Sequence, residues 1–369
     1  MSKIFLLIVL SIKGIGPKKI LKAFKGDFKL DLKDCLKVDS NLLLEKVNEF
    51  LGLKRAVTKK ELENAILKSK KILKDCENEG IQFVGYFDQE YPKLLRKIAK
   101  PPIILYYKGN LKQINDRINI ALIGTRKPSE WTIKAGEKIA NRLVREKITI
   151  VSGLASGCDT IGHSIAVSNL APTIAYLPCG LDRVYPLKNK ELANKILAKG
   201  CLVSEYPPGS KALKSHFGER DRLQSGSSHG VIVLESTIDG GTMITANCAI
   251  SQRRKLGVLW KRNVKVKNNE LKNNELKNSE FENAKGNSFL IRKKAEQIEC
   301  MADLNRFIKS CKNYKQLNLL PNYEDKDGLK QLRIFEEQMT YKINLKSDFE
   351  EKNIYEKKEN KENEENEEW

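Results

Sequence analysis

Apolar residues recur every three or four positions through the first part of the chain, which is the spacing of one helix face. The runs at 4–10, 20–24 and 61–76 each predict a helix, and together they predict a small helical domain at residues 1–75. The run at 4–10 follows Lys3 and resembles the apolar part of a secretory signal, but no small-residue cleavage site follows it. We therefore expect it to form a helix buried in this domain.

From residue 118 onward, short runs rich in β-branched residues alternate with helical patterns. The runs expected to form strands are 118–123, 148–151, 173–177, 201–204, 231–235 and 256–259, and the helical patterns between them are 132–146, 160–169, 191–199 and 242–253. Such alternation is typical of βαβ units that build a parallel sheet. We therefore predict an α/β fold, an extended Rossmann-like, doubly wound parallel sheet, over residues 76–310.

Two segments lack this periodicity. A five-residue repeat that begins NNELK fills much of 261–285, and its low complexity predicts an exposed insertion in the Rossmann-like domain. From 311 to 369 the chain becomes rich in Glu, Lys and Asn, so we expect a charged and largely disordered tail.

Charge and composition narrow the partners and the compartment. Lys and Arg number 67 against 47 Asp and Glu, and the net charge of +20 favours a polyanion or an acidic membrane surface, with a lysine-rich surface lacking a partner as the alternative. The eight cysteines have no C-x-x-C spacing, so we expect reduced, buried thiols in a cytoplasmic protein and no metal site. No later stretch approaches the roughly 20 apolar residues that span a bilayer, so membrane insertion is not expected.

Ligands of a parallel sheet bind where the strands end at its carboxyl edge. Three predicted strands run into loops rich in glycine or small residues, namely Gly124-Thr125-Arg126, Ser152-Gly153-Leu154-Ala155-Ser156-Gly157 and Asp239-Gly240-Gly241-Thr242. Glycine lets the backbone approach a phosphate closely, helix N-termini offer unpaired N–H donors, and the guanidinium of Arg126 matches phosphate oxygens. Three such loops at one edge predict an anion pocket, whereas each alone is also explained as an ordinary tight turn.

These loops match neither G-x-x-x-x-G-K-[ST] nor, after the first strand, G-x-G-x-x-G, so no cofactor is expected. In the helical part, Gly14-Ile15-Gly16-Pro17 is similar to the hairpin of helix-hairpin-helix modules, whose turn offers N–H groups to a phosphate. A simple turn between two helices explains that sequence equally well.

The same residues belong to an ordered set that resembles the DprA/Smf family of DNA-processing proteins, over about residues 10–308. The matching motifs are Gly14-Ile15-Gly16-Pro17, Tyr91-Pro92-Lys93-Leu94-Leu95, the three loops above, His163, Gly180-Leu181-Asp182, Tyr185-Pro186, Ser204-Glu205-Tyr206-Pro207, Phe217 and Arg220-Asp221-Arg222. No tripeptide among them is diagnostic, but the ordered set is specific.

The resemblance implies a homodimer with an extended Rossmann-like fold that is not an enzyme. It also implies binding of single-stranded DNA, protection of strands taken up in natural transformation, and loading of the RecA recombinase for homologous recombination. It places the DNA contacts at Gly124, Thr125, Arg126, Ser152, Gly153, Phe217, Arg220, Arg222, Gly240, Gly241 and Thr242. Among these, Phe217 lies between basic residues and suits the stacking of an unpaired base.

The chain also departs from the family pattern. The usual Arg-Asn-Arg is Arg220-Asp221-Arg222 here, so a carboxylate is expected beside the DNA path, where it would weaken binding. The winged-helix domain that ends many members is not recognisable after residue 312, so its contacts are not transferred.

Two other functions stay open at this point. The loop at 239–242 superficially resembles the P-G-G-x-G-T motif of phosphoribohydrolase-like enzymes of the same superfamily, but the glutamate expected just inside the helix is absent. The second is an interaction scaffold with weak DNA binding, which Asp221 and the insertion would suit.

Several titratable residues invite a catalytic interpretation. His163 follows Asp159 by one helical turn and could form a catalytic dyad with it, although a structural hydrogen bond is the favoured interpretation. Asp182 and Glu205 lie at strand ends and could be paired acid and base groups, but we expect each to accept hydrogen bonds from loop amides. His229 is expected on the surface or in a loop.

Overall fold

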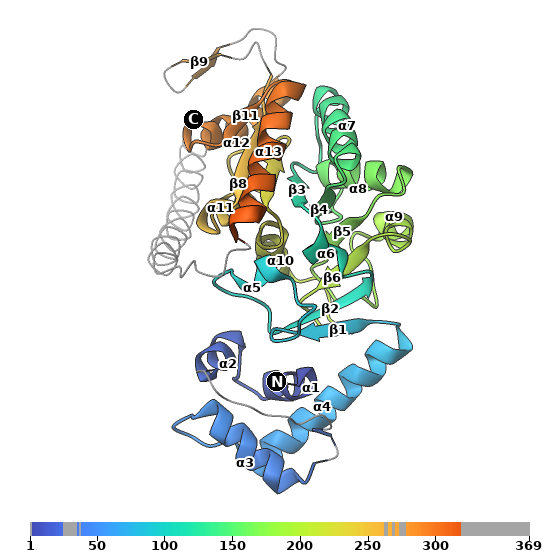
Figure 1. Ribbon diagram of the computed structural model, residues 1–369, viewed down its shortest axis with the longest axis vertical. Helices are drawn as coiled ribbons and strands as arrows, with labels where there is room; N and C mark the ends of the chain where they lie inside the picture. Colours follow the sequence, from blue (N-terminus) through green and yellow to red (C-terminus); the bar gives the residue numbers. More distant parts are fainter. Residues whose placement is uncertain are drawn as a thin grey trace, which may run out of the picture. The chain divides into compact units, whose positions relative to one another are not determined.

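The computed structural model describes residues 2–24, 35–36, 38–261, 265–267, 270–272 and 278–318, without the side chains of 265–284 and 316–318 (Figure 1). All described elements belong to one compact unit, Met1–Pro321. Most of the predicted tail, and residues 262–264, 268–269 and 273–277 of the predicted insertion, lie outside the described residues. Within that insertion, β9 (Lys265–Lys267) pairs antiparallel with β10 (Glu270–Lys272), and α12 (Asn278–Arg292) begins.

Four helices open the chain, namely α1 (Lys3–Ser11), α2 (Pro17–Ala23), α3 (Ser40–Leu51) and α4 (Lys59–Asn78). The first, second and fourth confirm the expected helices, whereas α3 was not predicted. Because α1 is apolar on nearly all sides, it is stable only where neighbours cover it. Its residues from Phe5 to Val9 are at most 2% exposed, which confirms the expected buried helix.

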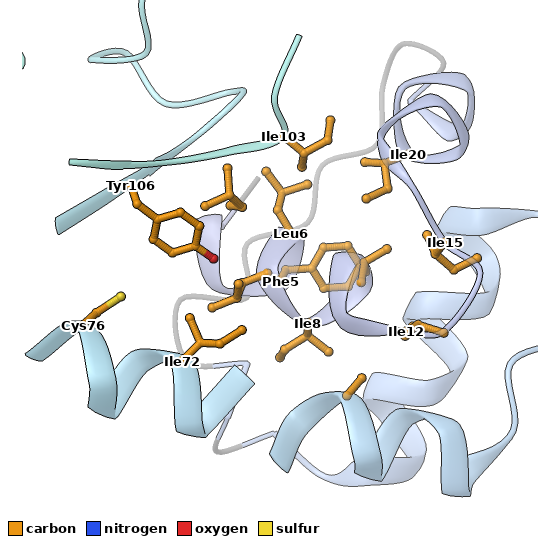
Figure 2. Close-up of a cluster of buried hydrophobic side chains, with 14 of the residues drawn as sticks. Phe5, Leu6, Ile8, Ile12, Ile15, Ile20, Ile72, Cys76, Ile103 and Tyr106 are labelled. Atoms are coloured by element: carbon orange, nitrogen blue, oxygen red, sulfur yellow. The ribbon is translucent and has the colours of Figure 1, made fainter. Parts of the chain in front are cut away.

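Figure 2 shows the side chains that bury α1. Ile72 and Cys76 belong to α4, while Ile103 and Tyr106 come from the segment that forms β2 (Ile104–Gly109). The four helices and one end of the sheet therefore share a single apolar cluster. Tyr106 is 2% exposed and belongs to the core.

The nine strands of the main sheet follow the order β1-β2-β6-β5-β4-β3-β7-β8-β11. Apart from β2, they are β1 (Gln82–Gly85), β3 (Asn119–Ile123), β4 (Thr149–Ser152), β5 (Thr173–Tyr176), β6 (Cys201–Ser204), β7 (Gly230–Val233), β8 (Lys255–Leu259) and β11 (Glu296–Ile298). From β6 to β11 in this order all neighbours are parallel, whereas β1 and β2 pair antiparallel at one edge. The six predicted strands and the α/β class are confirmed, and β1, β2 and β11 are additional.

Helices cover both faces of the sheet. They are α5 (Lys93–Arg96), α6 (Gln113–Asp116), α7 (Glu130–Arg145), α8 (Cys158–Ser168), η1 (Leu187–Asn189), α9 (Lys190–Ile196), α10 (Lys214–Gly226), α11 (Thr242–Ser251), α12 and α13 (Met301–Asn318). Side chains alternate along a strand, so Ile120 and Leu122 of β3 pack with α7, α8 and α13, whereas Ala121 and Ile123 pack with α10, α11 and α12. The chain changes face at β3, so the carboxyl end of β3 lies at the switch point where ligands of such sheets bind.

Three expectations drawn from composition can be compared with the residues that the structure describes. Among them, no helix is both long and apolar enough to cross a membrane, and no three His, Cys, Asp or Glu side chains gather as a metal site. Six cysteines are buried and Cys248 is half-buried, but Cys300 is exposed, so the expectation of buried thiols is wrong for Cys300.

Candidate functional site

A hollow of about 170 Å³ opens at the carboxyl edge of the sheet. Its lining residues come from the loops after β3, β4 and β5 and from α10, and they are Arg126, Gly153, Ala155, Ser156, Pro178, Tyr185, Pro186, Phe217 and Arg220. The structure therefore brings Arg126, Gly153, Phe217 and Arg220 together, four of the residues that the sequence placed at the site.

Backbone hydrogen bonds join the loop after β3 to the segment that follows β7 and to the start of α8. The Thr125 N–H donates to the carbonyl of Glu235 at 2.7 Å, and the Cys158 N–H donates to the carbonyl of Thr125 at 3.1 Å. Gly157 has a φ of +79°, and a Cβ there would lie 2.5 Å from the Thr125 oxygen. Only glycine fits this position, because both the backbone conformation and the close approach exclude a side chain.

A buried carboxylate shapes the loop between β4 and α8. Asp159 accepts hydrogen bonds from the N–H groups of Gly153 at 3.1 Å and Ala155 at 3.2 Å. In the described part of the chain, no acceptor pairs with the backbone N–H of Ser156 or Gly157 at the start of α8. Unpaired N–H groups and the positive end of the helix dipole both favour an anion at this position.

Arg126 carries the accessible positive charge of the pocket. Its side chain is exposed, and its guanidinium carbon lies 5.8 Å from the centre of the Phe217 ring. Among the described residues, no carboxylate forms an ion pair with it. The guanidinium is therefore held beside the pocket by an aromatic surface, with its hydrogen-bond donors left for a ligand.

Arg220 is in the opposite state, since it is only 5% exposed. Its Nη1 donates to the carbonyl of Tyr176 at 3.0 Å, and its Nε lies 3.2 Å from a carboxylate oxygen of Asp221. Burial raises the pKa of Asp221 to about 6 and also raises the pKa of Asp159, while the charge of Arg220 opposes both shifts. Two buried carboxyl groups thus surround the charge of Arg220. The Asp221 side chain is 13% exposed, so most of it is buried beside Arg220 rather than open on the surface.

Gly153 is the place where Arg220 fits. A Cβ built on Gly153 would lie 1.5 Å from Nη1 of Arg220, so any side chain at this position would displace the guanidinium. The glycine of the β4 loop therefore admits an arginine from α10 as well as bringing the backbone to the pocket.

Arg222 is outside the pocket lining. It donates to both oxygens of Glu205 at 2.8 Å, and the two side chains are 18% and 19% exposed. Burial raises the pKa of Glu205 against the attraction of Arg222. The expectation that Glu205 accepts hydrogen bonds from loop amides is therefore wrong, because Arg222 is its partner. Asp182 confirms that expectation, since it accepts from the Gly209 N–H at 2.9 Å.

The other predicted site residues support the loops or lie apart from the hollow. Ser152 is buried and its hydroxyl donates to the carbonyl of Leu122 at 2.7 Å. Gly124, Thr125, Gly240, Gly241 and Thr242 are also absent from the pocket lining. Thr242 begins α11, whose first turn carries no acidic residue, so the glutamate of the phosphoribohydrolase-like motif is absent at that position.

The sequence reasoning missed three residues of the lining, Pro178, Tyr185 and Pro186. Tyr185 is 43% exposed, and its ring packs on Phe217 with centroids 5.2 Å apart and planes at 73°. Tyr185-Pro186 belongs to the motifs that resemble the DprA/Smf family, which is the signal that could have placed it at the site.

The two histidines discussed above, His163 and His229, are both buried. Nδ1 of His163 lies 2.7 Å from the hydroxyl of Thr173, and burial lowers the pKa of His163 to about 3. Asp159 instead binds the β4 loop, so the two residues form no dyad and the favoured structural role of His163 is confirmed. His229 lies in the loop before β7, one of its two expected positions, but it is not on the surface, since it is 4% exposed and its Nδ1 accepts a hydrogen bond from the Asn119 N–H.

A doubly wound sheet with a cationic hollow at its switch point defines a Rossmann-like protein with a pocket suited to an anion. The family model described as DNA recombination-mediator protein A matches residues 82–309. The chain belongs to this family, which confirms its resemblance to the DprA/Smf proteins.

Several named proteins are similar to this chain. The DNA processing protein DprA of Bacillus subtilis is 31% identical over 242 residues, which are 66% of this chain and 79% of that protein. The Smf protein of Synechocystis is 35% identical over 242 residues, 64% of this chain and 59% of that protein. The DprA of Streptococcus pneumoniae is 40% identical over 167 residues, 45% of this chain and 58% of that protein. The chain thus spans little more than half of two of these relatives.

Two solved structures share the fold. The X-ray structure of DprA from Streptococcus pneumoniae superposes with a TM-score of 0.65 at 28% identity, covering 83% of this chain and 98% of that chain. The DprA of Helicobacter pylori, whose structure concerns its single-stranded DNA binding mode, superposes with a TM-score of 0.53 at 28% identity. That match covers 63% of this chain and 98% of the other.

Proposed function

We propose that this protein binds single-stranded DNA and that the hollow beside Arg126 holds a phosphate of the DNA backbone. The proposal rests on the exposed guanidinium of Arg126. It lies beside the N-terminus of α8 and forms no ion pair with any described carboxylate. A phosphate there would accept charge-assisted hydrogen bonds from the guanidinium and further ones from the amides of Ser156 and Gly157.

Three further observations favour single-stranded DNA as the anion. The net charge of +20 suits a polyanion. Aromatic rings at Phe217 and Tyr185 line the same hollow as Arg126, and proteins that bind single strands combine backbone cations with aromatic surfaces in this way. The described structure of the Helicobacter pylori relative concerns single-stranded DNA binding.

The experiment is a titration of the purified chain with a labelled oligo-dT strand, in competition with unlabelled single-stranded and duplex DNA. We expect the single strand to compete at least about tenfold better than the duplex, a difference of ~1.4 kcal/mol. The affinity should fall as salt rises, with a slope in log–log form of about −0.7 for each phosphate contacted. Equal competition by both DNAs, or no binding at low salt, would refute the proposal.

We further propose that the protein acts as a homodimer without enzymatic activity, protects single strands taken up in transformation or used in recombination, and loads the RecA recombinase on them. Membership of the family supports this part. Light scattering at several concentrations tests the dimer. Assembly of RecA filaments on single-stranded DNA, with and without the protein, tests loading, and an unchanged rate of assembly would contradict it.

A further inference from the structure

We propose that the outer face of α4 is a docking surface for an anionic lipid membrane, to which the protein binds peripherally. The residues of this face are Leu67, Lys68, Lys70, Lys71 and Lys74, and we call it the lysine face. None of them lines the hollow beside Arg126, so the inference goes beyond the proposed function and does not depend on it.

The lysine face is the solvent side of an amphipathic helix. The inner side of α4 is set by buried residues at a spacing of three or four, which are Leu62, Ala65, Ser69, Ile72 and Cys76. On the opposite side Leu67, Lys71 and Lys74 follow the same spacing and are exposed, and Lys68 and Lys70 flank them. The chain therefore presents four ammonium groups within about two turns of one helix.

Nothing in the described structure compensates this charge. No Asp or Glu occurs between Asn64 and Lys74, and none of the four lysines forms an ion pair with a described residue. On α7, by contrast, Arg142 pairs with Glu146 one turn later.

The unpaired lysines also repel one another. Lys71 lies three residues from both Lys68 and Lys74, and Lys70 lies four residues from Lys74. Like charges at these spacings destabilise a helix. An anionic surface on this face would relieve the repulsion, so the arrangement is stabilised by such a partner.

Leu67 favours a membrane over a nucleic acid as that partner. It is 65% exposed and lies among the four lysines, where a phosphate backbone would offer it no apolar contact. The lysine face also lacks the aromatic rings on which proteins stack unpaired bases. An anionic bilayer offers phosphate groups to the ammonium groups and, just below them, an apolar boundary to the leucine and to the hydrocarbon stems of the lysines.

The test is co-sedimentation of the full chain with vesicles at about 0.1 M salt. We expect binding to vesicles with about one third phosphatidylglycerol in phosphatidylcholine, and none to phosphatidylcholine alone. The double variant Lys71→Glu, Lys74→Glu should bind the anionic vesicles at least about 30-fold more weakly, because each lysine at such a surface contributes about fivefold. Leu67→Gln, which keeps the charge, should weaken binding about fivefold by removing the apolar contact.

Two control variants match these changes. Lys134→Glu, Lys138→Glu makes the same change in net charge at two exposed positions of α7. It should weaken vesicle binding less than about threefold, because charges more than about 10 Å from the membrane are screened at this salt concentration. Leu170→Gln, at a residue that is 74% exposed after α8, should leave binding unchanged.

Three outcomes would overturn the inference. They are the absence of wild-type binding to the anionic vesicles, equal losses in the two double variants, and a Leu67→Gln variant that binds as the wild type does. The double variants are also titrated with oligo-dT and with duplex DNA, and we expect them to bind DNA alike. A greater loss of DNA affinity in the α4 variant would assign the lysine face to nucleic acid and overturn the inference as well. Wild-type binding to oligo-dT in the same preparation tests the proposed function separately, so the two failures are distinguishable.

Discussion

The two walls of the hollow carry the same kind of side chain in different electrostatic states. The loop after β3 holds Arg126 exposed and without an ion-pair partner among the described residues, whereas α10 holds Arg220 and Arg222 against carboxylates. Arg220 is buried between Asp159 and Asp221, and Arg222 is occupied by Glu205. Arg126 is therefore a cation that is available to a ligand, whereas the arginines of α10 are structural groups.

The difference follows from the elements that carry these residues. Arg126 lies in a loop on the surface, where water solvates its charge. Residues of α10 pack against the sheet and α11, and a charge taken out of water there needs partners of opposite charge. Asp159 of α8, Asp221 of α10 and Glu205 after β6 supply them, so Arg220 contributes to the pocket mainly by shaping it.

The largest effect should come from Arg220→Met, which removes a buried cation and leaves Asp159 and Asp221 without it. Losing one partner of a buried charge pair costs about 3–5 kcal/mol. We expect a loss of this size in the free energy of unfolding, measured by urea denaturation. Arg126→Met should change it by less than about 0.5 kcal/mol, as surface substitutions do. Equal stability of the two variants would contradict the assignment of a structural role to Arg220 and not to Arg126.

Next in size is the effect of Arg126→Ala on DNA binding. Charge-assisted hydrogen bonds contribute about 1.5–3 kcal/mol, so we expect the affinity for single-stranded DNA to fall by roughly 10- to 150-fold. The far-ultraviolet circular dichroism should match that of the wild type.

Arg145→Ala is the control for Arg126→Ala, because Arg145 is exposed and ends α7 at the opposite end from the hollow. It removes the same unit of charge and should weaken binding only slightly, through net charge. A similar loss in both variants would show that binding depends on total charge and not on the pocket.

The smallest effect concerns Asp221. Burial raises the pKa of its carboxyl group from 3.8 to about 6. Between these two pH values the folded chain holds a proton on Asp221, whereas the unfolded chain has released it. The stability due to this group is complete below pH ~4 and is lost as the pH rises through about 6. Asp221→Asn cannot ionise, so relative to the wild type it should gain about 1 kcal/mol in stability between pH 5 and pH 7.5.

Urea denaturation of wild type and Asp221→Asn at both pH values measures this gain, and taking the difference cancels the titration of other groups. No change in the difference would mean that Arg220 fully compensates the buried carboxylate. Because Asp221 is mostly buried and pairs with Arg220, the same variant should alter DNA affinity at pH 7.5 much less than Arg126→Ala does.

Periodicity predicted the centre of the sheet because β3 to β8 are short, continuously apolar strands between amphipathic helices. It did not predict β2, whose run Ile104–Gly109 pairs antiparallel with β1 on one side and with β6, far along the chain, on the other. Nor did it predict α10, because Arg220, Gln224 and Ser225 are buried there and polar residues on the inner face hide the helical pattern.

The candidate site was predictable in its loops but not in its electrostatics. The glycines and Arg126 could be placed at the carboxyl edge because the strands before them were recognised. The burial of Arg220 depends on the carbonyl of Tyr176, 44 residues earlier, and on Asp159. Contacts of that kind leave no local signal in the sequence, so Arg126 and Arg220 were both predicted to be DNA contacts.

The fit of Arg220 into the space above Gly153 also constrains the order in which this protein can change. While the arginine keeps this position, even a single added carbon at 153 would overlap the guanidinium and would have to displace it from the Tyr176 carbonyl and from Asp221. A path that avoids this displacement shortens residue 220 before residue 153 is enlarged. That intermediate is the least stable state along the path, because two acidic groups lose their counter-charge in it. We therefore expect Gly153 and Arg220 to depend on each other, with a cost of changing either that is set by Asp159 and Asp221.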